Sequence, residues 1–385
     1  MAVKKGYKQT EVGVIPEDWR VVSLSQVADL RNGYAFRSST YTAIGDHRIV
    51  TIANVQDGRM ELAECNRIKD PPRDLQPYQK LAIGDLLVSM TGNVGRTCRV
   101  SEDGLLLNQR VGKLIARGID NGFLAHAMSS RRFLRQMIDA AAGGAQGNLS
   151  KNAIVQYLVE LPPTLAEQEA IAGALSDADA WIESLEQLIA KKRLIKQGAM
   201  QELLTGKRRL PGFSGEWETK RLGDVLRVRH GKSQNEIAAE NGCYPILASG
   251  GEIGRTNTAL HSGPSVLIGR KGTIDAPQYS ASPFWSVDTL FFTEIDSANC
   301  AKWIYYRFCL VQWRKYNEAS GVPSLNARTI EAIELELPAL NEQTAIASVL
   351  SDMDSEIEAL EVQLAKAREI KQGMMQELLT GRIRI

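Results

Sequence analysis

Residues Leu165–Arg209 read LAEQEAIAGALSDADAWIESLEQLIAKKRLIKQGAMQELLTGKRR, and residues Leu340–Arg384 read LNEQTAIASVLSDMDSEIEALEVQLAKAREIKQGMMQELLTGRIR. The two stretches align without a gap at an offset of 175 residues (340 minus 165), and most aligned positions are identical. Two copies are too few for a solenoid, which needs about three or more repeats. The sequence is therefore built as two halves.

Each copy has the apolar spacing of one long helix. Apolar residues recur at alternating steps of three and four positions, which makes a narrow seam suited to a second helix. The seam residues are Leu175, Ile182, Leu185, Ile189, Leu203, Leu350, Ile357, Leu360, Leu364 and Leu378. Pro162 and Pro338 precede the copies, and Gly206 and Gly381 follow them as stop signals. A helix of about 40 residues is roughly 60 Å long.

Two near-identical seams in one chain are complementary to each other. The simplest way to bury both is an antiparallel pair of helices about a pseudo-twofold axis. Lys192, Lys196 and Lys371 interrupt the seam, where they either fix the register of the pair or face a partner. The Asp-x-Asp pairs that end at Asp179 and Asp354 are interpreted as complements to the helix macrodipole rather than as metal ligands.

Length and composition describe an ordinary folded protein. The 385 residues leave room for two or three domains, and 44% are hydrophobic and 24% charged. The net charge of +1 is too balanced for a protein that coats nucleic acid non-specifically. Cysteines and histidines show no metal-ligand spacing, so we expect no zinc and no cofactor. No apolar run fits a secretory signal or a membrane span, and we expect a cytoplasmic protein.

Each half contains a globular body before its long helix. Both halves open on a similar lead-in, led by Trp19 in the first half and by Trp217 in the second. The bodies that follow, Tyr34–Glu160 and Lys232–Glu336, have unlike sequences. They share a strand with a glycine-bearing turn, a helical patch and a closing apolar strand. The helical patches are predicted at Phe123–Ile138 and Ala301–Tyr316. Two copies of one mixed α/β fold with diverged surfaces are therefore expected.

The order of these segments resembles the specificity subunit of type I restriction-modification systems. The resemblance covers essentially the whole chain. Its most specific parts are Glu167-Gln168 and Glu342-Gln343, each followed by a helix that ends in IKQGxMQELLTG. It implies two globular target-recognition domains separated by two long helices that pack as an antiparallel coiled coil. The segments expected are residues 1–160 (first domain), 161–210 (first helix), 211–336 (second domain) and 337–385 (second helix).

The resemblance also implies a function and partners. Each recognition domain is expected to read one half of an asymmetric, interrupted site in double-stranded DNA, and the helices to set the spacer. Two modification (methyltransferase) subunits are expected to dock on the chain, and restriction (translocase and nuclease) subunits to join through the complex. Independently, two unlike readers on one rod would recognise two unlike sequences at a fixed separation.

Catalytic motifs are absent or broken in the chain, which we therefore expect not to be an enzyme alone. Asp70-Pro71-Pro72-Arg73 lacks the aromatic residue of an adenine-methyltransferase motif, and Gly231-Lys232-Ser233 lacks the upstream glycine of a phosphate-binding loop. For DNA contact, Arg, Asn and Gln suit base edges and Lys suits phosphate. The candidates are Asn93, Arg96, Gln109, Arg110, Arg131, Arg132 and Arg135 in the first body, and Arg270, Lys271, Arg314, Lys315 and Asn326 in the second.

Two other functions stay open on the sequence alone. A coiled-coil adaptor would join proteins without binding DNA, whereas a DNA-binding protein should show a steep salt dependence. A self-contained methyltransferase should bind its cofactor as an isolated chain. The bases recognised cannot be deduced from the variable bodies.

Overall fold

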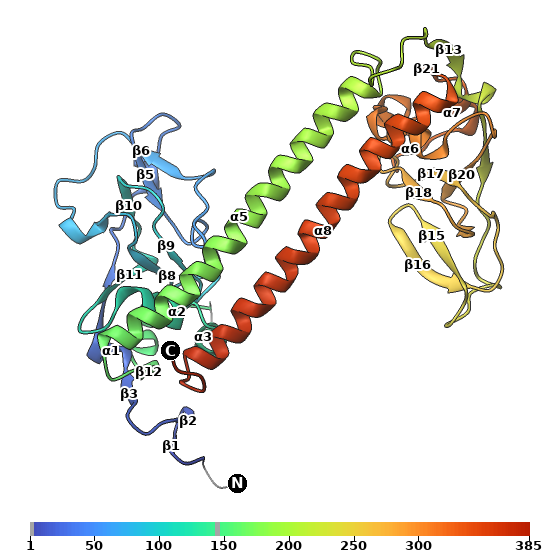
Figure 1. The fold of residues 1–385 in the computed structure, drawn as a ribbon. Coiled ribbons are helices and arrows are strands. Elements are labelled where there is room, and N and C mark those ends of the chain that lie inside the picture. The colour runs from blue at the N-terminus through green and yellow to red at the C-terminus, as the bar shows by residue number, and fades with distance from the viewer. Residues whose placement is uncertain (1–3, 143–146) are drawn as a thin grey trace. The chain divides into compact units, whose positions relative to one another are not determined.

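The computed structural model describes residues 4–142 and 147–385, and the chain separates into two compact units. Unit 1 comprises the chain up to Ser184 together with Leu364–Ile385, and unit 2 comprises Leu185–Gln363. The long helices α5 (Leu165–Leu203) and α8 (Leu340–Leu378) each contribute to both units (Figure 1). Each unit thus combines one body with the start of one helix and the end of the other.

Both long helices begin and end where the repeat predicts. Each has 39 residues, and in α5 the Thr164 hydroxyl accepts the backbone N–H of Glu167 at 3.2 Å. Gly206 and Gly381 follow with φ of 69° and 67°, the left-handed conformation that glycine adopts readily at a helix end. The prediction of two long helices is confirmed.

Unit 1 is built on a four-stranded antiparallel sheet in the order β4-β11-β8-β9. Its strands are β4 (Ala28–Asn32), β11 (Val111–Ala116), β8 (Leu86–Ser89) and β9 (Thr97–Arg99). A second sheet runs in the order β6-β5-β10-β7, with β5 and β10 parallel. It comprises β6 (Asn66–Ile68), β5 (His47–Val50), β10 (Leu105–Leu107) and β7 (Lys80–Leu81).

Short elements complete unit 1. The pairs are β1 (Tyr7–Thr10) with β2 (Gly13–Pro16), and β3 (Arg20–Ser23) with β12 (Leu158–Leu161). The helices are α1 (Leu24–Val27), α2 (Asn121–Met128), α3 (Arg131–Ala142) and α4 (Lys151–Val155). The 3-10 turns are η1 (Ser38–Thr40) and η2 (Pro77–Gln79). The single helical patch expected at Phe123–Ile138 is two helices, because the chain turns at Ser129 and Ser130.

Unit 2 repeats this topology. Its four-stranded sheet has the equivalent order β14-β20-β17-β18, from β14 (Leu226–His230), β20 (Leu290–Ile295), β17 (Ser265–Gly269) and β18 (Gln278–Ser280). The second sheet has three strands, β16 (Gly251–Thr256), β15 (Tyr244–Ala248) and β19 (Trp285–Ser286). The expectation of one fold in two copies is confirmed.

The remaining elements of unit 2 show where the copies differ. They are β13 (Glu218–Arg221) paired with β21 (Glu334–Leu337), η3 (Leu222–Asp224), α6 (Ala301–Leu310), η4 (Trp313–Tyr316) and α7 (Ala327–Glu331). Where unit 1 has the 12-residue helix α3, unit 2 has only the short turn η4. The patch expected at Ala301–Tyr316 is therefore also interrupted.

Each hydrophobic core takes residues from both sequence repeats. In unit 1, Trp19 and Phe123 pack in one cluster with Leu175 of α5 and Leu378 of α8. In unit 2, the cluster combines Trp303 and Trp313 with Leu203 and Leu204 from the end of α5 and with Leu350 from α8. The end of one helix therefore completes the core of the other repeat's body.

The seam positions are all buried or half-buried, and those near the helix ends belong to the body cores. Leu175, Leu185, Ile189, Leu203, Leu350, Ile357 and Leu378 are buried, and Ile182, Leu360 and Leu364 are half-buried. The interrupting lysines face carboxylates of the opposite helix, since Lys371 pairs with Asp179 in unit 1 and Lys196 with Asp354 in unit 2. Lys192 also pairs with Glu356 at 2.6 Å.

The macrodipole interpretation of the aspartates was wrong for these two pairs. Asp179 and Asp354 lie about four turns into their helices, too far from the first turn to complement the dipole. Their carboxylates instead neutralise lysines of the opposite helix.

Candidate nucleic-acid interface

Four loops of unit 1 meet at one end of its main sheet, and we call them loop cluster 1. They are residues 51–60, 90–96, 108–110 and 147–150. The backbone N–H of Leu149 donates to the Met90 carbonyl at 2.8 Å, and the N–H of Met90 donates to the Arg110 carbonyl at 3.0 Å. The Arg96 guanidinium donates through Nη1 to Oε1 of Gln56 at 2.6 Å. Backbone and side-chain bonds thus hold the four loops together.

Unit 2 carries the equivalent loop cluster 2. It comprises residues 249–250, 270–277, 287–289 and 311–326. The N–H of Leu325 donates to the Arg270 carbonyl at 2.9 Å, as Leu149 does to Met90 in the first unit. The N–H of Arg270 donates to the Thr289 carbonyl at 2.8 Å. The two units therefore present unlike side chains on the same arrangement of loops.

Four predicted residues of the first body belong to loop cluster 1. Asn93, Gln109 and Arg110 are exposed, and Arg96 is half-buried. Gln56, which orients Arg96, was missed, since one polar residue in a polar loop gives no signal in the sequence. Of the small-residue stretch 143–150, residues 143–146 lie outside the described residues, which resume at Gly147.

The three other predicted residues of this body lie on α3. Arg131, Arg132 and Arg135 line a groove of about 530 Å³ against the end of α8. Arg132 is fully engaged, because it pairs with Glu160 and donates through Nη2 to the Leu158 carbonyl at 2.6 Å. Burial raises the pKa of Glu160, and the cation of Arg132 offsets only part of that cost. We correct the assignment of Arg132, which stabilises the fold.

Loop cluster 2 contains the five predicted residues of the second body. Lys271, Arg314, Lys315 and Asn326 are exposed, and Arg270 is half-buried. Asn326 caps α7, since its Oδ1 accepts the N–H of Arg328 at 2.9 Å. Nε of Arg314 donates to Oδ2 of Asp275 at 2.6 Å. Asp275 was not predicted, because nothing in the sequence indicates a pair so far apart along the chain.

The Glu-Gln motif at each helix start joins helix and body. In unit 1, Oε1 of Gln168 accepts the N–H of Asp120 at 2.8 Å, and its Nε2 donates to the Pro162 carbonyl at 3.2 Å. In unit 2, Gln343 bonds to the N–H of Cys300 at 2.9 Å and to the Pro338 carbonyl at 2.9 Å. The motif is therefore structural.

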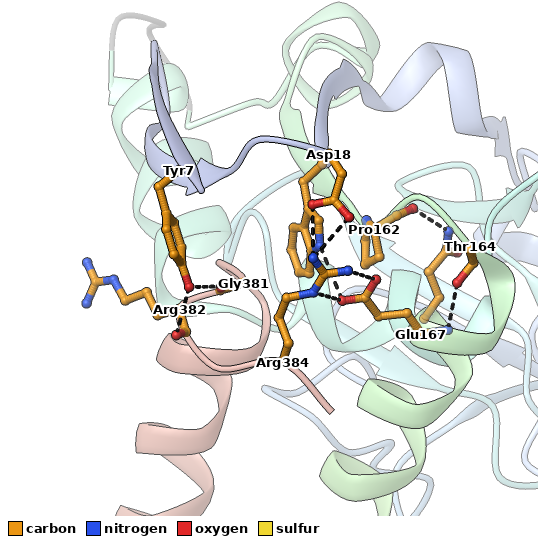
Figure 2. Close-up of polar contacts among 10 residues, drawn as sticks. Tyr7, Asp18, Pro162, Thr164, Glu167, Gly381, Arg382 and Arg384 are labelled. Carbon is orange, nitrogen blue, oxygen red and sulfur yellow. Dashed lines mark hydrogen bonds and ion pairs between the residues drawn. The ribbon is translucent and has the colours of Figure 1, made fainter. Parts of the chain in front are cut away.

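The glutamate of each motif receives an arginine from the end of the other repeat. In unit 1, Arg384 donates to both oxygens of Glu167 through Nε at 2.8 Å and Nη2 at 2.9 Å, and also to Asp18 (Figure 2). Arg209 makes the same two bonds to Glu342 in unit 2, at 2.5 and 2.6 Å. Arg209 and Arg384 are equivalent positions of the sequence repeat, as are Glu342 and Glu167. This equivalence is the feature of the sequence that indicates the pair.

The two ends of the chain meet in unit 1. The hydroxyl of Tyr7 donates to the carbonyl oxygens of Gly381 and Arg382, at 3.2 and 3.3 Å (Figure 2). Nε1 of Trp19 donates to Glu167 at 3.3 Å. In unit 2 the corresponding segment is continuous, because Arg209 leads directly into the second lead-in with Trp217.

Over residues 4–142 and 147–385, no group of three or more His, Cys, Asp or Glu side chains could hold a metal ion. None of the helices in these ranges is long and apolar enough to cross a membrane.

Comparison with known proteins then decides the family. The family model described as "Type I restriction modification DNA specificity domain" matches residues 16–192 and 214–367, once for each half. The chain belongs to this family. It is a specificity subunit of a type I restriction-modification system with two recognition domains.

Individual relatives agree with the family match. The putative type I restriction enzyme MjaX specificity subunit of Methanocaldococcus jannaschii is 24% identical, over 99% of this chain and 97% of that protein. The EcoBI specificity subunit of Escherichia coli is 29% identical over 62% of this chain and 51% of that one. The crystal structure of a type I S subunit from M. genitalium has a TM-score of 0.67 and 16% identity over 98% of both chains, which shows a shared fold. These matches favour DNA specificity over an adaptor that never binds DNA.

Proposed function

We propose that each body reads one half of an asymmetric, interrupted DNA site through its loop cluster, and that α5 and α8 set the spacer between the halves. The observation that carries the proposal is one sheet order beneath two loop clusters with unlike side chains. Shared architecture holds the loops, while divergent side chains meet different bases. The recognition domains would be residues 1–160 and 211–336, and the helical segments 161–210 and 337–385.

Within this proposal the polar side chains have distinct roles. Arginine, asparagine and glutamine can each form two bonds to a base edge, whereas lysine mainly holds phosphate. The proposed contacts are Asn93, Arg96, Gln109, Arg110, Arg131 and Arg135 for the first body, and Arg270, Lys271, Arg314, Lys315 and Asn326 for the second. Arg131 and Arg135, which lie on α3, would contact phosphate beside the loops.

Methyl transfer and cleavage would reside in partner subunits of a cytoplasmic complex. Two modification subunits would dock on the long helices, and restriction subunits would join through them. Large apolar side chains support docking: Trp181 and Ile370 in unit 1 are 47% and 44% exposed, and Leu194 in unit 2 is 69% exposed. The purified chain, given only a methyl donor and DNA, should transfer no methyl groups; transfer by the chain alone would contradict this division of labour.

The test of separate reading is a body exchange. Replacing Tyr34–Glu160 by the body of another specificity subunit should change one half-site and leave the other unchanged. The reciprocal exchange of Lys232–Glu336 should change only the second. Methylated positions would be mapped for the parent and both chimaeras with the same modification subunit. If either exchange altered both half-sites, the two bodies would not read DNA independently.

A further inference from the structure

One arginine of loop cluster 2 is held by a hydrogen bond that leaves the terminal nitrogens of its guanidinium available for a ligand. The Arg314 side chain is 78% exposed, and its Nε donates to Oδ2 of Asp275 at 2.6 Å. This bond uses the inner nitrogen of the guanidinium and restrains its orientation, and within the described residues it is the one hydrogen bond of the Arg314 guanidinium, so Nη1 and Nη2 stay unpaired. The hydrogen bond from Arg314 lowers the pKa of Asp275, which is ionised at neutral pH.

The backbone beneath Arg314 is anchored as well. The neighbouring Trp313 is buried, and its Nε1 donates to the Phe308 carbonyl at 2.8 Å. Its ring also lies 5.0 Å from that of Phe308. Asp275 lies in the loop between β17 and β18, whose first residues are tied to the 311–326 loop through Leu325 and Arg270. Both partners of the pair are thus positioned before any ligand arrives, which lowers the entropy cost of binding.

The other basic side chains of loop cluster 2 lack this arrangement. Nη1 of Arg270 donates to the Asp288 carbonyl at 3.2 Å, so one of its terminal nitrogens is occupied. Nη1 of Arg96 in the first unit is occupied in the same way by Gln56. Lys271 and Lys315 carry compact ammonium groups that bind phosphate as point charges. Arg314 therefore differs from its neighbours in offering both ends of its guanidinium.

Two parallel N–H donors on a fixed plane match one base edge best. In the major groove, guanine presents two acceptors, O6 and N7, whereas adenine presents one acceptor beside a donor and cytosine presents a donor. Within the proposed function, on which this step rests, we propose that Arg314 reads a guanine in the half-site of the second body. Asp275 is the positioning residue that holds the guanidinium in plane.

The first experiment maps the methylated sites of three variants and one control, each produced as the full chain with its modification subunit. Arg314→Ala should lose about ten- to a hundredfold of the discrimination for guanine at one position of the second half-site, as expected for a lost bidentate contact. Arg314→Lys should bind DNA but discriminate poorly at that same position. Asp275→Asn should weaken discrimination there by a smaller factor. The first half-site should stay unchanged in all of them.

The matched control is Arg221→Ala. Arg221 also lies in unit 2 and faces a carboxylate through Nε, with Glu334 at 3.6 Å, but it sits on β13 away from loop cluster 2. Its removal should leave both half-sites unchanged. A motif shift in Arg221→Ala equal to that in Arg314→Ala would mean that the effect reflects damage to unit 2.

The second experiment tests the atoms directly. Duplexes would carry 7-deazaguanine, which lacks N7, at the guanine assigned by the mapping. Wild-type complex should bind the modified duplex about tenfold more weakly than the natural one, and Arg314→Ala should bind both equally. Equal loss in both proteins, or an Arg314→Ala motif identical to wild type, would overturn the assignment.

The body exchange distinguishes failure of this assignment from failure of the proposed function. If exchange of Lys232–Glu336 changes the second half-site while Arg314→Ala does not, only the assignment fails. If the exchange changes nothing, the proposed function itself fails.

Discussion

At the scale of single residues, the two units use different side chains for the same contact between a body helix and a long helix. In unit 2, the hydroxyl of Tyr306 on α6 donates to Asp354 at 2.7 Å and lies 3.2 Å from the Ser351 hydroxyl. In unit 1, His126 on α2 takes this place, with Nε2 3.0 Å from the hydroxyl of Ser176, which is Ser351 minus the repeat offset. The body residue that makes this contact is therefore a histidine in unit 1 and a tyrosine in unit 2.

We predict that unit 1 loses stability in mild acid because of His126. Burial lowers the pKa of His126 from 6.5 to about 4, and Lys371 and Arg99 add to the shift while Asp179 opposes it. Because the unfolded chain takes up this proton more readily, the contribution is complete above pH 6.5 and is lost between about pH 6.5 and 4. From pH 7 to pH 5, wild type should lose about 2 kcal/mol more unfolding free energy than His126→Gln.

Urea unfolding at the two pH values measures this difference. His230→Gln, which removes an exposed histidine in unit 2, should keep the wild-type dependence on pH. Equal loss in wild type and His126→Gln would show that the buried ring does not control acid stability.

At the scale of the elements, ion pairs between α5 and α8 set the register that the apolar seam leaves open. Repeated leucines along the middle of the seam specify register only weakly, whereas a lysine that lost its aspartate would be half-buried and unpaired. Lys196 with Asp354 and Lys371 with Asp179 are the same pair in the two units, related by the offset of 175.

A double-mutant cycle should reveal this coupling. Lys196→Met and Asp354→Asn should each destabilise unit 2, and the double variant should cost less than their sum by about 0.5–1 kcal/mol, a value kept small because the pair is partly exposed. Asparagine still accepts the hydrogen bond of Tyr306, so the cycle isolates the charge. Chemical unfolding of the four proteins gives the coupling, and Lys191→Met replaces Lys196→Met as the exposed control. A coupling energy of zero would mean that the ion pair does not help to set the register and that the apolar seam alone sets it.

At the scale of the whole molecule, the sequence predicted what the repeat itself encodes. A gapless offset specifies two long helices and two related bodies, and turn and strand signals indicate the common sheet. It did not predict that each core is completed by the helix end of the other repeat, because contacts such as Glu167 with Arg384 join positions far apart in the chain. The loop clusters were only partly predicted, since Gln56 and Asp275 act through partners that only the fold brings close.

Lengthening both helices should lengthen the spacer of the DNA site. Seven residues inserted after Ser184 in α5 and after Gln363 in α8 preserve the phase of the seam and leave the residues of each unit together. The insertion adds about 10 Å of helix, or about three base pairs at roughly 3.4 Å each. Methylation mapping should find the same two half-sequences farther apart. An active variant with an unchanged spacer would mean that the helices hold partners without measuring DNA.

The most direct test of two independent readers on one chain is the map of methylated bases in DNA from cells that express this chain with its modification subunit. Cells with the modification subunit alone supply the background. The account predicts one new motif made of two short, unlike sequences separated by a fixed run of unspecified bases. A contiguous or palindromic motif, or methylation that is the same without this chain, would contradict it.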